Sequence, residues 1–449
     1  MDGDLAYTRK ERASVFISTL FGYGLDFYNI LIISFLMSAI QKSLGLTLTQ
    51  AGVITSVTLV GSVIGGVFFG WIGDRVGRKT SLLLTLGLFS LGALASSFSW
   101  DFASLLFFRF VTGIGLGGEW GAGVVLFNEV WDRNRRGFGS ALIQAASTAG
   151  LGAASVISIW ALNTFSPDWG WRIALLTGSS PILLMVYVRF WMPESKLWLE
   201  YERLRAAGQL PPEKENAKTA IVEIFKGPSL RYTLIGFLMV SGYMFAFYSI
   251  TVFMPGYMTS LGATPSVVRS VSLILSGVMA LSYIGFGWFS DGLGRKISVI
   301  VPTLIAIVGY AGIYASAETP YAGSLMWLLL GWYALWGAGQ VSAGMFGPWF
   351  SELYPVEVRS TAVSTIYVVG RGVGSFSPFL VPMVVSGFNT QIINGMMIGV
   401  IAAFACLIAA LLLPETAGRR FSVIEAKRQD SNAVLPTSGS VGQTAPGGA

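Results

Sequence analysis

Histidine is missing from this chain of 449 residues, and cysteine occurs once, at Cys406 within an apolar run. Imidazole metal sites, histidine-based catalysis and a secreted disulfide scaffold are therefore excluded. Charge is scarce as well, since Asp, Glu, Lys and Arg make up 12% of the residues, where a soluble globular protein carries roughly 25%. Hydrophobic residues make up 53%, and there are 55 glycines in addition. No water-soluble fold has an interior for so much apolar surface, so we expect an integral membrane protein.

About twelve apolar stretches are long enough to cross a hydrocarbon core of about 30 Å as helices. They lie near residues 14–40, 50–73, 80–98, 102–128, 138–165, 171–192, 231–257, 268–290, 297–315, 322–350, 360–386 and 390–413. The first stretch is too long for the core of a signal peptide, so it counts as a helix of the protein. The expected fold class is an all-α membrane protein with twelve transmembrane helices.

The distribution of basic residues sets the expected orientation. With the N-terminus in the cytoplasm, 23 of the 29 Lys and Arg residues fall in cytoplasmic segments, as the positive-inside rule requires. We therefore expect a multi-pass protein of the cell membrane (inner or plasma membrane) with both termini in the cytoplasm. The net charge of +6 is then a topology signal, so anionic membrane lipid is the expected partner and nucleic acid is not.

One long polar connection divides the twelve helices into six and six. It predicts an N-terminal half over 1–193, a cytoplasmic linker over 194–230 with short amphipathic surface helices, a C-terminal half over 231–428, and a disordered tail over 429–449. The two halves repeat each other. The segment 70–79 matches 287–296, the Glu129/Arg136 pair matches Glu352/Arg359, and Pro193-Glu-Ser matches Pro414-Glu-Thr, at offsets of about 220 residues. Parallel repeats of this kind are pseudo-symmetric about the membrane normal, with substrate near the midplane between them.

The repeated pattern Gly-x-x-x-Asp-x-x-Gly-Arg-Lys, at 70–79 and again at 287–296, resembles the signature of the major facilitator superfamily. The resemblance covers about residues 10–420 and implies transport by rocker-type alternating access. Basic side chains of the pattern can pair with carboxylates and hold the cytoplasmic side shut. The expected cytoplasmic gate consists of Asp74, Arg75, Arg78, Glu129, Arg136, Asp291, Arg295, Glu352 and Arg359.

Four charged residues lie within expected helices: Asp26, Arg109, Glu119 and Arg371. Each would cost about 2.5–3.5 kcal/mol facing lipid at the bilayer midplane, so they must face the protein interior or a wet cavity. Asp26 and Arg371 lie at similar depth in opposite halves. Glu119 is about 15 Å along the helix from Arg109, so these two cannot form a simple pair.

Arg371 lies between Gly370 and Gly372, and its planar guanidinium suits bidentate binding of a carboxylate. Desolvation favours the protonated form of a carboxyl group, so Asp26 and Glu119 are expected proton carriers, with Arg109 tuning or bridging them. The alternatives are that helix carbonyls or Asp26 neutralise Arg371, and that the acids only accompany buried arginines.

Three further segments resemble particular families of proton symporters within this superfamily. The segment 109–121, with its Gly-Glu-Trp, resembles the fourth-helix motif of metabolite:proton and sialate/lactate-type proton symporters. The segment 26–29 resembles their acidic-aromatic-aromatic-Asp element, although Asn29 stands at its last position. The segment from 351 to 371 resembles organic-acid symporters, many of which have Asn where this chain has Val368. The resemblance implies uptake of an organic anion together with protons.

Aromatic residues spaced by four mark two helix faces, one with Trp332 and Trp336, the other with Tyr243 and Phe247. These faces could hold the apolar part of an organic acid, although packing or lipid-facing aromatics are equally consistent with the spacing. Trp327 and Trp349, nearer helix ends, are expected at the membrane interface. The expected substrate site consists of Arg371, Asp26, Asn29, Gln144, Tyr243, Phe247, Trp336, Gln340 and Tyr367.

Gly113, Gly115 and Gly118 fit a dinucleotide-binding spacing, but they lie in an expected transmembrane helix, where small residues serve close helix packing. We therefore expect a secondary transporter and not an enzyme, with no catalytic residue, no metal and no cofactor apart from protons as coupling ion. It would import a small monocarboxylate such as lactate. The protein is expected to be a monomer. The alternatives are a sugar or polyol:proton symporter, a proton-coupled drug exporter and a receptor that binds without transport.

Overall fold

The structure of the chain is a computed structural model that describes residues 7–119, 123–131, 135–207, 222–317, 324–354 and 356–416. Every regular element in these ranges is a helix, which confirms the all-α fold class. The helices of the first half are α1 (Arg9–Leu44), α2 (Leu48–Val76), α3 (Arg78–Ser97), α4 (Phe102–Glu119), α5 (Val125–Val130), α6 (Arg136–Thr164), α7 (Pro167–Thr177) and α8 (Pro181–Trp191).

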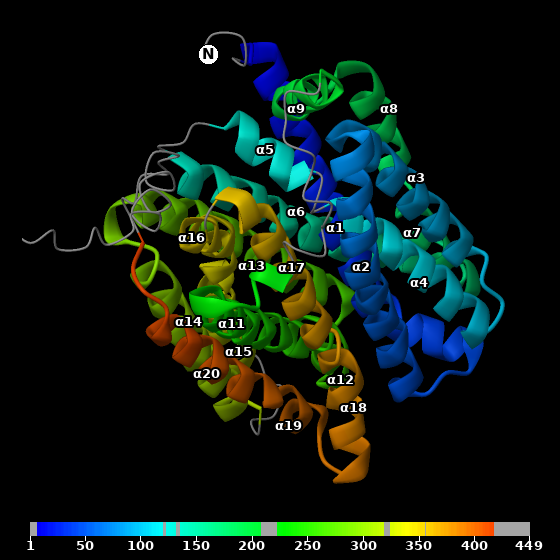
Figure 1. The fold of residues 1–449 in the computed structure, drawn as a ribbon. Coiled ribbons are helices and arrows are strands. Elements are labelled where there is room, and N and C mark those ends of the chain that lie inside the picture. Colours follow the sequence, from blue (N-terminus) through cyan, green and yellow to red (C-terminus); the bar gives the residue numbers. More distant parts are fainter. Residues whose placement is uncertain are drawn as a thin grey trace, which may run out of the picture.

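The linker contributes α9 (Lys196–Ala206), one of the short helices expected there. The helices of the second half are α11 (Gly227–Thr251), α12 (Met254–Ser260), α13 (Pro265–Leu293), α14 (Ile297–Ala315), α15 (Ser324–Ala338), η3 (Gly339–Met345), α16 (Phe346–Leu353), α17 (Val356–Gly374), α18 (Ser377–Gly387), α19 (Ile392–Met396) and α20 (Ile398–Leu412). In Figure 1 the blue helices α2 and α3 of the first half lie on the right, and α14, α15 and α20 of the second half lie on the left. The expected disordered tail, 429–449, lies outside the described residues.

Eleven segments of the described chain are long and apolar enough to cross a membrane. The remaining expected crossing, 322–350, is divided into α15, the 3₁₀ helix η3 and α16. Glycine and proline are poor residues in a helix interior, and this stretch contains Gly337, Gly339, Gly344 and Pro348. The division therefore follows from the local sequence, and the twelve-helix architecture in two halves holds.

The crossing expected over 390–413 is divided into α19 and α20 at Met397. Three further crossings expected as single helices are each divided in two beside a proline. The breaks fall between α7 and α8, between α11 and α12, and between α17 and α18. Pro181, Pro255 and Pro378 occupy the first turn of the helix after each break. Proline lacks the N–H that would continue the preceding helix, and it is tolerated at a helix start. The expected single helix over 102–128 is likewise described as α4 and α5, with 120–122 outside the described residues.

The glycines that fit a dinucleotide spacing serve helix packing instead. A Cβ atom on Gly113 would lie 2.0 Å from the carbonyl oxygen of Thr58 in α2, and one on the neighbouring Gly117 would lie 1.8 Å from that of Ser62. Helices α2 and α4 therefore approach each other backbone to backbone, which only glycine permits at these positions.

The repeated Pro-Glu-Ser/Thr motif has the same structural role in both halves. The Glu194 carboxylate accepts hydrogen bonds from the backbone N–H of Lys79 at 3.1 Å, at the start of α3. The Glu415 carboxylate accepts them from the backbone N–H groups of Arg295 and Lys296 at 2.9 and 3.0 Å, just before α14. Each acid thus satisfies backbone donors that have no partner within the helix.

Trp327 is 65% exposed, so its expected position at the membrane interface stays a prediction, but the expectation is wrong for Trp349. Trp349 is fully buried, and its indole N–H donates to the Pro414 carbonyl at 3.0 Å. Position near a helix end therefore did not indicate which way this side chain points.

Candidate functional site

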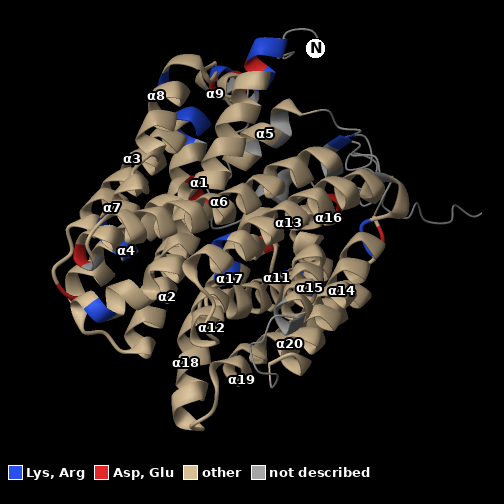
Figure 2. Cartoon of the chain, turned by 180° about the vertical axis from the view of Figure 1, so that it is seen from behind, with Lys and Arg blue, Asp and Glu red and all other residues tan. Residues whose placement is uncertain are grey.

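Three of the four expected intramembrane charges meet between the halves. Asp26 comes from α1, Glu119 from the end of α4 and Arg371 from α17. Their exposed fractions are 0%, 1% and 3%. Figure 2 shows that coloured, charged segments are few inside the bundle and more frequent at helix ends. We call these three residues the central triad.

The guanidinium of Arg371 interacts electrostatically with the Asp26 carboxylate and with the hydroxyl groups of Tyr248 and Tyr367. Its Nε and one terminal nitrogen are buried and donate no hydrogen bond to any described residue. A buried donor without a partner is costly, and the cost is larger for a charged group. The guanidinium therefore retains donors for a further acceptor.

The carboxyl groups of Asp26 and Glu119 face each other closely enough to share a hydrogen bond when one of them is protonated. No N–H or O–H group of the described residues donates to either of them. Both groups also interact electrostatically with Arg371. Gly22 makes room for this arrangement, because a Cβ atom there would lie 2.4 Å from Oε1 of Glu119.

Two expected site residues lie apart from the central triad. The guanidinium of Arg109 donates to the carbonyl of Asn29 at 3.4 Å and faces Tyr28. The side chain of Asn29 donates to the carbonyl of Gly178 at 2.8 Å, so it packs against the end of α7. The geometry thus differs from the expectation that Arg109 bridges the two acids, because its guanidinium is turned toward the backbone of α1 one turn beyond Asp26.

The expected aromatic residues form a cluster beside the central triad. Phe247 stacks on Tyr243 and on Trp336, with ring centroids 6.2 Å apart in both pairs. Phe27 of α1 meets Phe247 edge-on at 6.1 Å, so the cluster joins the two halves. Trp332 does not belong to it and packs against Gly312 of α14.

Polar side chains from both halves border the same region. The Tyr243 hydroxyl donates to the backbone carbonyl of Gln340 at 2.7 Å, and the amide oxygen of Gln340 is buried without a donor among the described residues. Gln144 of α6 donates to the carbonyl of Ala343 at 3.2 Å. Tyr367 shares a hydrogen bond of 3.2 Å with Tyr23 across the two halves. The region therefore combines aromatic surface with unused polar atoms, as small-molecule sites do.

The halves contact each other on both sides of the central triad. Near the expected outer face, a Cβ atom on Gly52 of α2 would lie 2.2 Å from the carbonyl oxygen of Pro378. Near the expected cytoplasmic face, a Cβ atom on Gly347 would lie 3.6 Å from the hydroxyl of Ser140. The triad is thus enclosed from both ends in this conformation.

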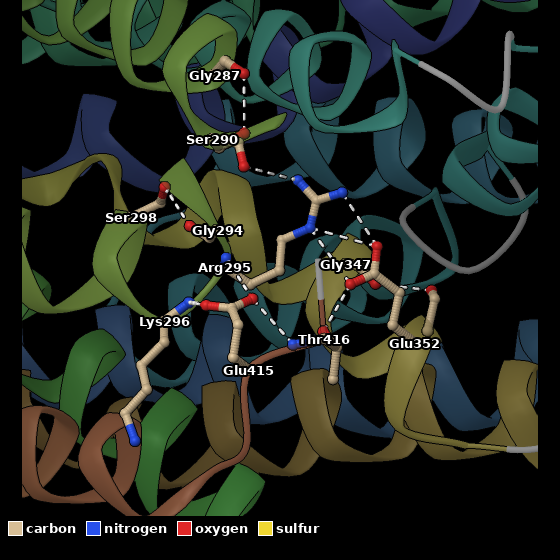
Figure 3. A network of polar contacts seen from close by, with 11 residues as sticks. Gly287, Ser290, Gly294, Arg295, Lys296, Ser298, Gly347, Glu352, Glu415 and Thr416 are labelled. Atoms are coloured by element: carbon tan, nitrogen blue, oxygen red, sulfur yellow. Dashed lines mark hydrogen bonds and ion pairs between the residues drawn. The ribbon is translucent and has the colours of Figure 1, made fainter. Parts of the chain in front are cut away.

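Two residues of the expected cytoplasmic gate, Arg295 and Glu352, belong to the network of polar contacts in Figure 3. The Arg295 guanidinium donates to the Glu352 carboxylate at 3.0 Å, and Thr416 donates to the same carboxylate at 2.6 Å. Arg295 also donates to the carbonyl of Ser290 at 3.4 Å. We call Arg295, Glu352, Glu415 and Thr416 the cytoplasmic network, after the side of the membrane on which the positive-inside rule predicts them.

The other gate residues are placed differently or are not described. Arg75 is exposed, and its guanidinium lies 4.4 Å from the ring centroid of Trp71. Arg78 is half-buried at the start of α3. The side chains of the remaining members, Asp74, Glu129, Arg136, Asp291 and Arg359, lie outside what the structure describes.

Sequence reasoning missed several residues of the site. Tyr23 precedes Asp26 by three positions, so helical spacing could have placed it on the same face. Phe27 was noted only as part of a motif. Tyr283 donates from its hydroxyl to the Gln340 carbonyl at 3.1 Å. Neither Tyr283 nor Tyr248 gave a signal in the sequence, because aromatic residues are frequent throughout the chain. Among the described residues, no group of His, Cys, Asp or Glu side chains has the geometry of a metal site.

Comparison with known proteins shows the family to which the chain is similar. The sequence profile of the Major Facilitator Superfamily matches residues 19–378. The chain is 25% identical to the sialic acid transporter NanX of Escherichia coli, over 93% of this chain and 97% of that protein. It is 28% identical to the niacin transporter NiaP of Acinetobacter baylyi, over 90% of this chain and 94% of that protein.

Among solved structures, the proton:xylose symporter XylE bound to 6-bromo-6-deoxy-D-glucose has a similar fold. Its TM-score is 0.75 at 19% sequence identity, with 94% of this chain and all of that chain covered. At this identity the likeness concerns the fold, and it says nothing of the substrate.

Proposed function

The chain belongs to the major facilitator superfamily, and from that premise we propose that it imports a small organic carboxylate together with protons across the cell membrane. The observation that carries the proposal is the enclosed Arg371 guanidinium, whose Nε and one terminal nitrogen have no acceptor among the described residues. A carboxylate supplies two coplanar acceptors and the opposite charge, which a neutral sugar lacks.

The surroundings of Arg371 support a small acid with an apolar or cyclic body. Phe27, Phe247 and Trp336 offer aromatic surface from both halves. NanX and NiaP, by their names, transport sialic acid and niacin, which both carry a single carboxylate on a ring. A ring could lie against the aromatic cluster while its carboxylate binds Arg371, with Gln340 hydrogen-bonding the polar substituents.

Alternating access fits the two sets of contacts between the halves. Separation of Gly347 from Ser140 would open the triad to the cytoplasm, and separation of Gly52 from Pro378 would open it to the outside. In this proposal Arg371 binds the substrate, and Asp26 and Glu119 bind protons. Arg295 and Glu352 fix the position of α16 within the second half. Gly347 of α16 contacts Ser140 of the first half, so the network keeps the inner side closed through that contact. Arg109 would stabilise α1 against α4 through the Asn29 carbonyl.

Purified protein in proteoliposomes tests this function. Initial uptake of labelled nicotinate, lactate, N-acetylneuraminate and xylose would be measured with an alkaline interior and again after addition of a protonophore. We expect at least one acid to accumulate against its gradient, a protonophore to abolish that accumulation, and xylose to remain at background. Uptake of xylose alone, or of no acid in the panel, would overturn the proposal.

A further inference from the structure

The numbers of acids and bases in the central triad do not match. Two carboxyl groups, Asp26 and Glu119, face one guanidinium, Arg371. Among the residues that the structure describes, the other groups that interact with Asp26, Glu119 or Arg371 are neutral tyrosine hydroxyls, those of Tyr23, Tyr248 and Tyr367. Arg109 is buried too, but it is turned to Tyr28 and the Asn29 carbonyl and interacts with neither acid.

This imbalance limits how many protons the triad can lose. If both carboxyls were ionised, the enclosed region would carry one unpaired negative charge with no hydrogen-bond donor to either acid among the described residues. Burying an unpaired charge is strongly unfavourable, and two adjacent carboxylates cannot both ionise readily. With one shared proton the triad is neutral, and the shared hydrogen bond satisfies one oxygen of each acid.

A bound substrate anion adds one negative charge to the enclosed region. When a carboxylate occupies Arg371, its charge replaces that of the ionised member of the acid pair. The enclosed region is neutral again only if that member takes up a second proton, which forms an O–H bond with a proton drawn from the side open to water. When the anion is released on the other side, Arg371 again pairs with the ionised member of the acid pair. The second proton is released together with the anion.

We infer that Asp26 and Glu119 act as one proton site, which holds one proton when Arg371 is free and two when a carboxylate is bound. This inference rests on the proposed function and adds the coupling ratio: about one proton enters per carboxylate group, and the cycle moves no net charge. The pair is interchangeable, because either acid alone can balance Arg371.

Proton uptake on binding tests the inference directly. The probe is whichever of nicotinate, lactate and N-acetylneuraminate gives the highest uptake, since each carries one carboxylate. Its binding to the purified protein would be measured calorimetrically near neutral pH in two buffers that differ in ionisation enthalpy. We expect uptake of about one proton per anion in the wild type, in Asp26→Asn and in Glu119→Gln, and none in the double variant.

Other outcomes would overturn this inference while leaving the proposed function in place. Two independent proton sites would give about two protons in the wild type and one in each single variant. A single proton carrier would give no uptake in one of the single variants. If no acid of the panel binds, the proposed function itself fails.

A second measurement covers the possibility that the double variant does not fold. In wild-type proteoliposomes, an inside-negative potential imposed with potassium and valinomycin should leave the initial rate of acid uptake unchanged, because the cycle moves no net charge. Acceleration of uptake by more than about twofold would mean that positive charge enters with each anion, and it would contradict the inference.

Discussion

Two buried arginines of this chain have opposite surroundings. Arg295, in the cytoplasmic network, is 7% exposed and donates to Glu352 and to the carbonyl of Ser290. Arg371, in the central triad, is 3% exposed, and two of its three nitrogens have no acceptor among the described residues. A guanidinium whose donors are all used holds structure together, whereas one with donors left over has room for a transient partner. Substitutions at the two sites should therefore have different kinds of effect.

The largest difference should come from removing each guanidinium in turn. Arg371→Gln should reduce carboxylate uptake about 100-fold or more, because loss of a buried charged partner typically costs about 2–5 kcal/mol of binding. Arg295→Gln, the matched variant, should leave carboxylate affinity within about threefold of wild type. Initial uptake rates and equilibrium binding in both variants measure the difference, and equal losses would abolish the distinction between the two sites.

Gly22→Ala tests whether the position of the Glu119 carboxyl matters, because this substitution disturbs the central triad without removing a charge. The new methyl group would lie 2.4 Å from Oε1 of Glu119 and force that carboxyl out of place. We expect uptake to fall about tenfold, since overpacking of this kind costs about 1–3 kcal/mol.

The control for Gly22→Ala is Gly277→Ala on α13, where a Cβ atom meets nothing within 4 Å. This variant should transport like wild type. If Gly22→Ala behaves in the same way, the position of Glu119 does not matter for transport.

Breaking the cytoplasmic network should change the conformational balance and not the chemistry of the site. Cys406 is 1% exposed, so a cysteine placed at Ser140 reports opening toward the cytoplasm with little background. Glu352→Gln should raise the labelling rate of that cysteine about fivefold, because the amide oxygen is a weaker acceptor for Arg295 and a loss of about 1 kcal/mol corresponds to about a fivefold change in an equilibrium. An unchanged rate would show that the Arg295–Glu352 pair does not hold this side closed.

The smallest effects should come from the two repeated glutamates. Glu194→Gln and Glu415→Gln each weaken hydrogen bonds to backbone donors at the start of the third helix of their half. Each should lower the Tm of the purified protein by about 2 °C, the shift that loss of about 1 kcal/mol produces. Thermal unfolding measures both, and a loss of carboxylate binding in either would mean that these acids belong to the transport site.

Much of the fold could be predicted because lipid imposes simple rules. The length of each apolar stretch predicted the transmembrane helices, and the internal sequence repeat predicted the two halves. The breaks at Pro181, Pro255 and Pro378 were missed. A hydropathy average over many residues hardly changes at one proline, whereas the proline removes a backbone hydrogen bond and interrupts the helix. The misplaced Trp349 has a related cause, since hydropathy does not indicate which face of a helix meets lipid and which meets protein.

The site was predictable in part, for an energetic reason. Charges within the membrane are expensive, so Asp26, Glu119 and Arg371 stood out in the sequence. Which of them meet depends on how three helices pack, and spacing along one helix carries no such information. Arg109 was therefore assigned to the acids, whereas it contacts the Asn29 carbonyl. Tyr248 was missed because nothing local distinguishes it from the other tyrosines.

The central claim is that Arg371 binds the carboxylate of the substrate, and a matched pair of compounds tests it most directly. Binding of the best acid of the panel would be compared with binding of its primary amide, which has a similar shape and no charge, in wild type and in Arg371→Gln. We expect the wild type to prefer the acid by about 100-fold and the variant to show no preference. A variant that still prefers the acid to the same degree would contradict the account.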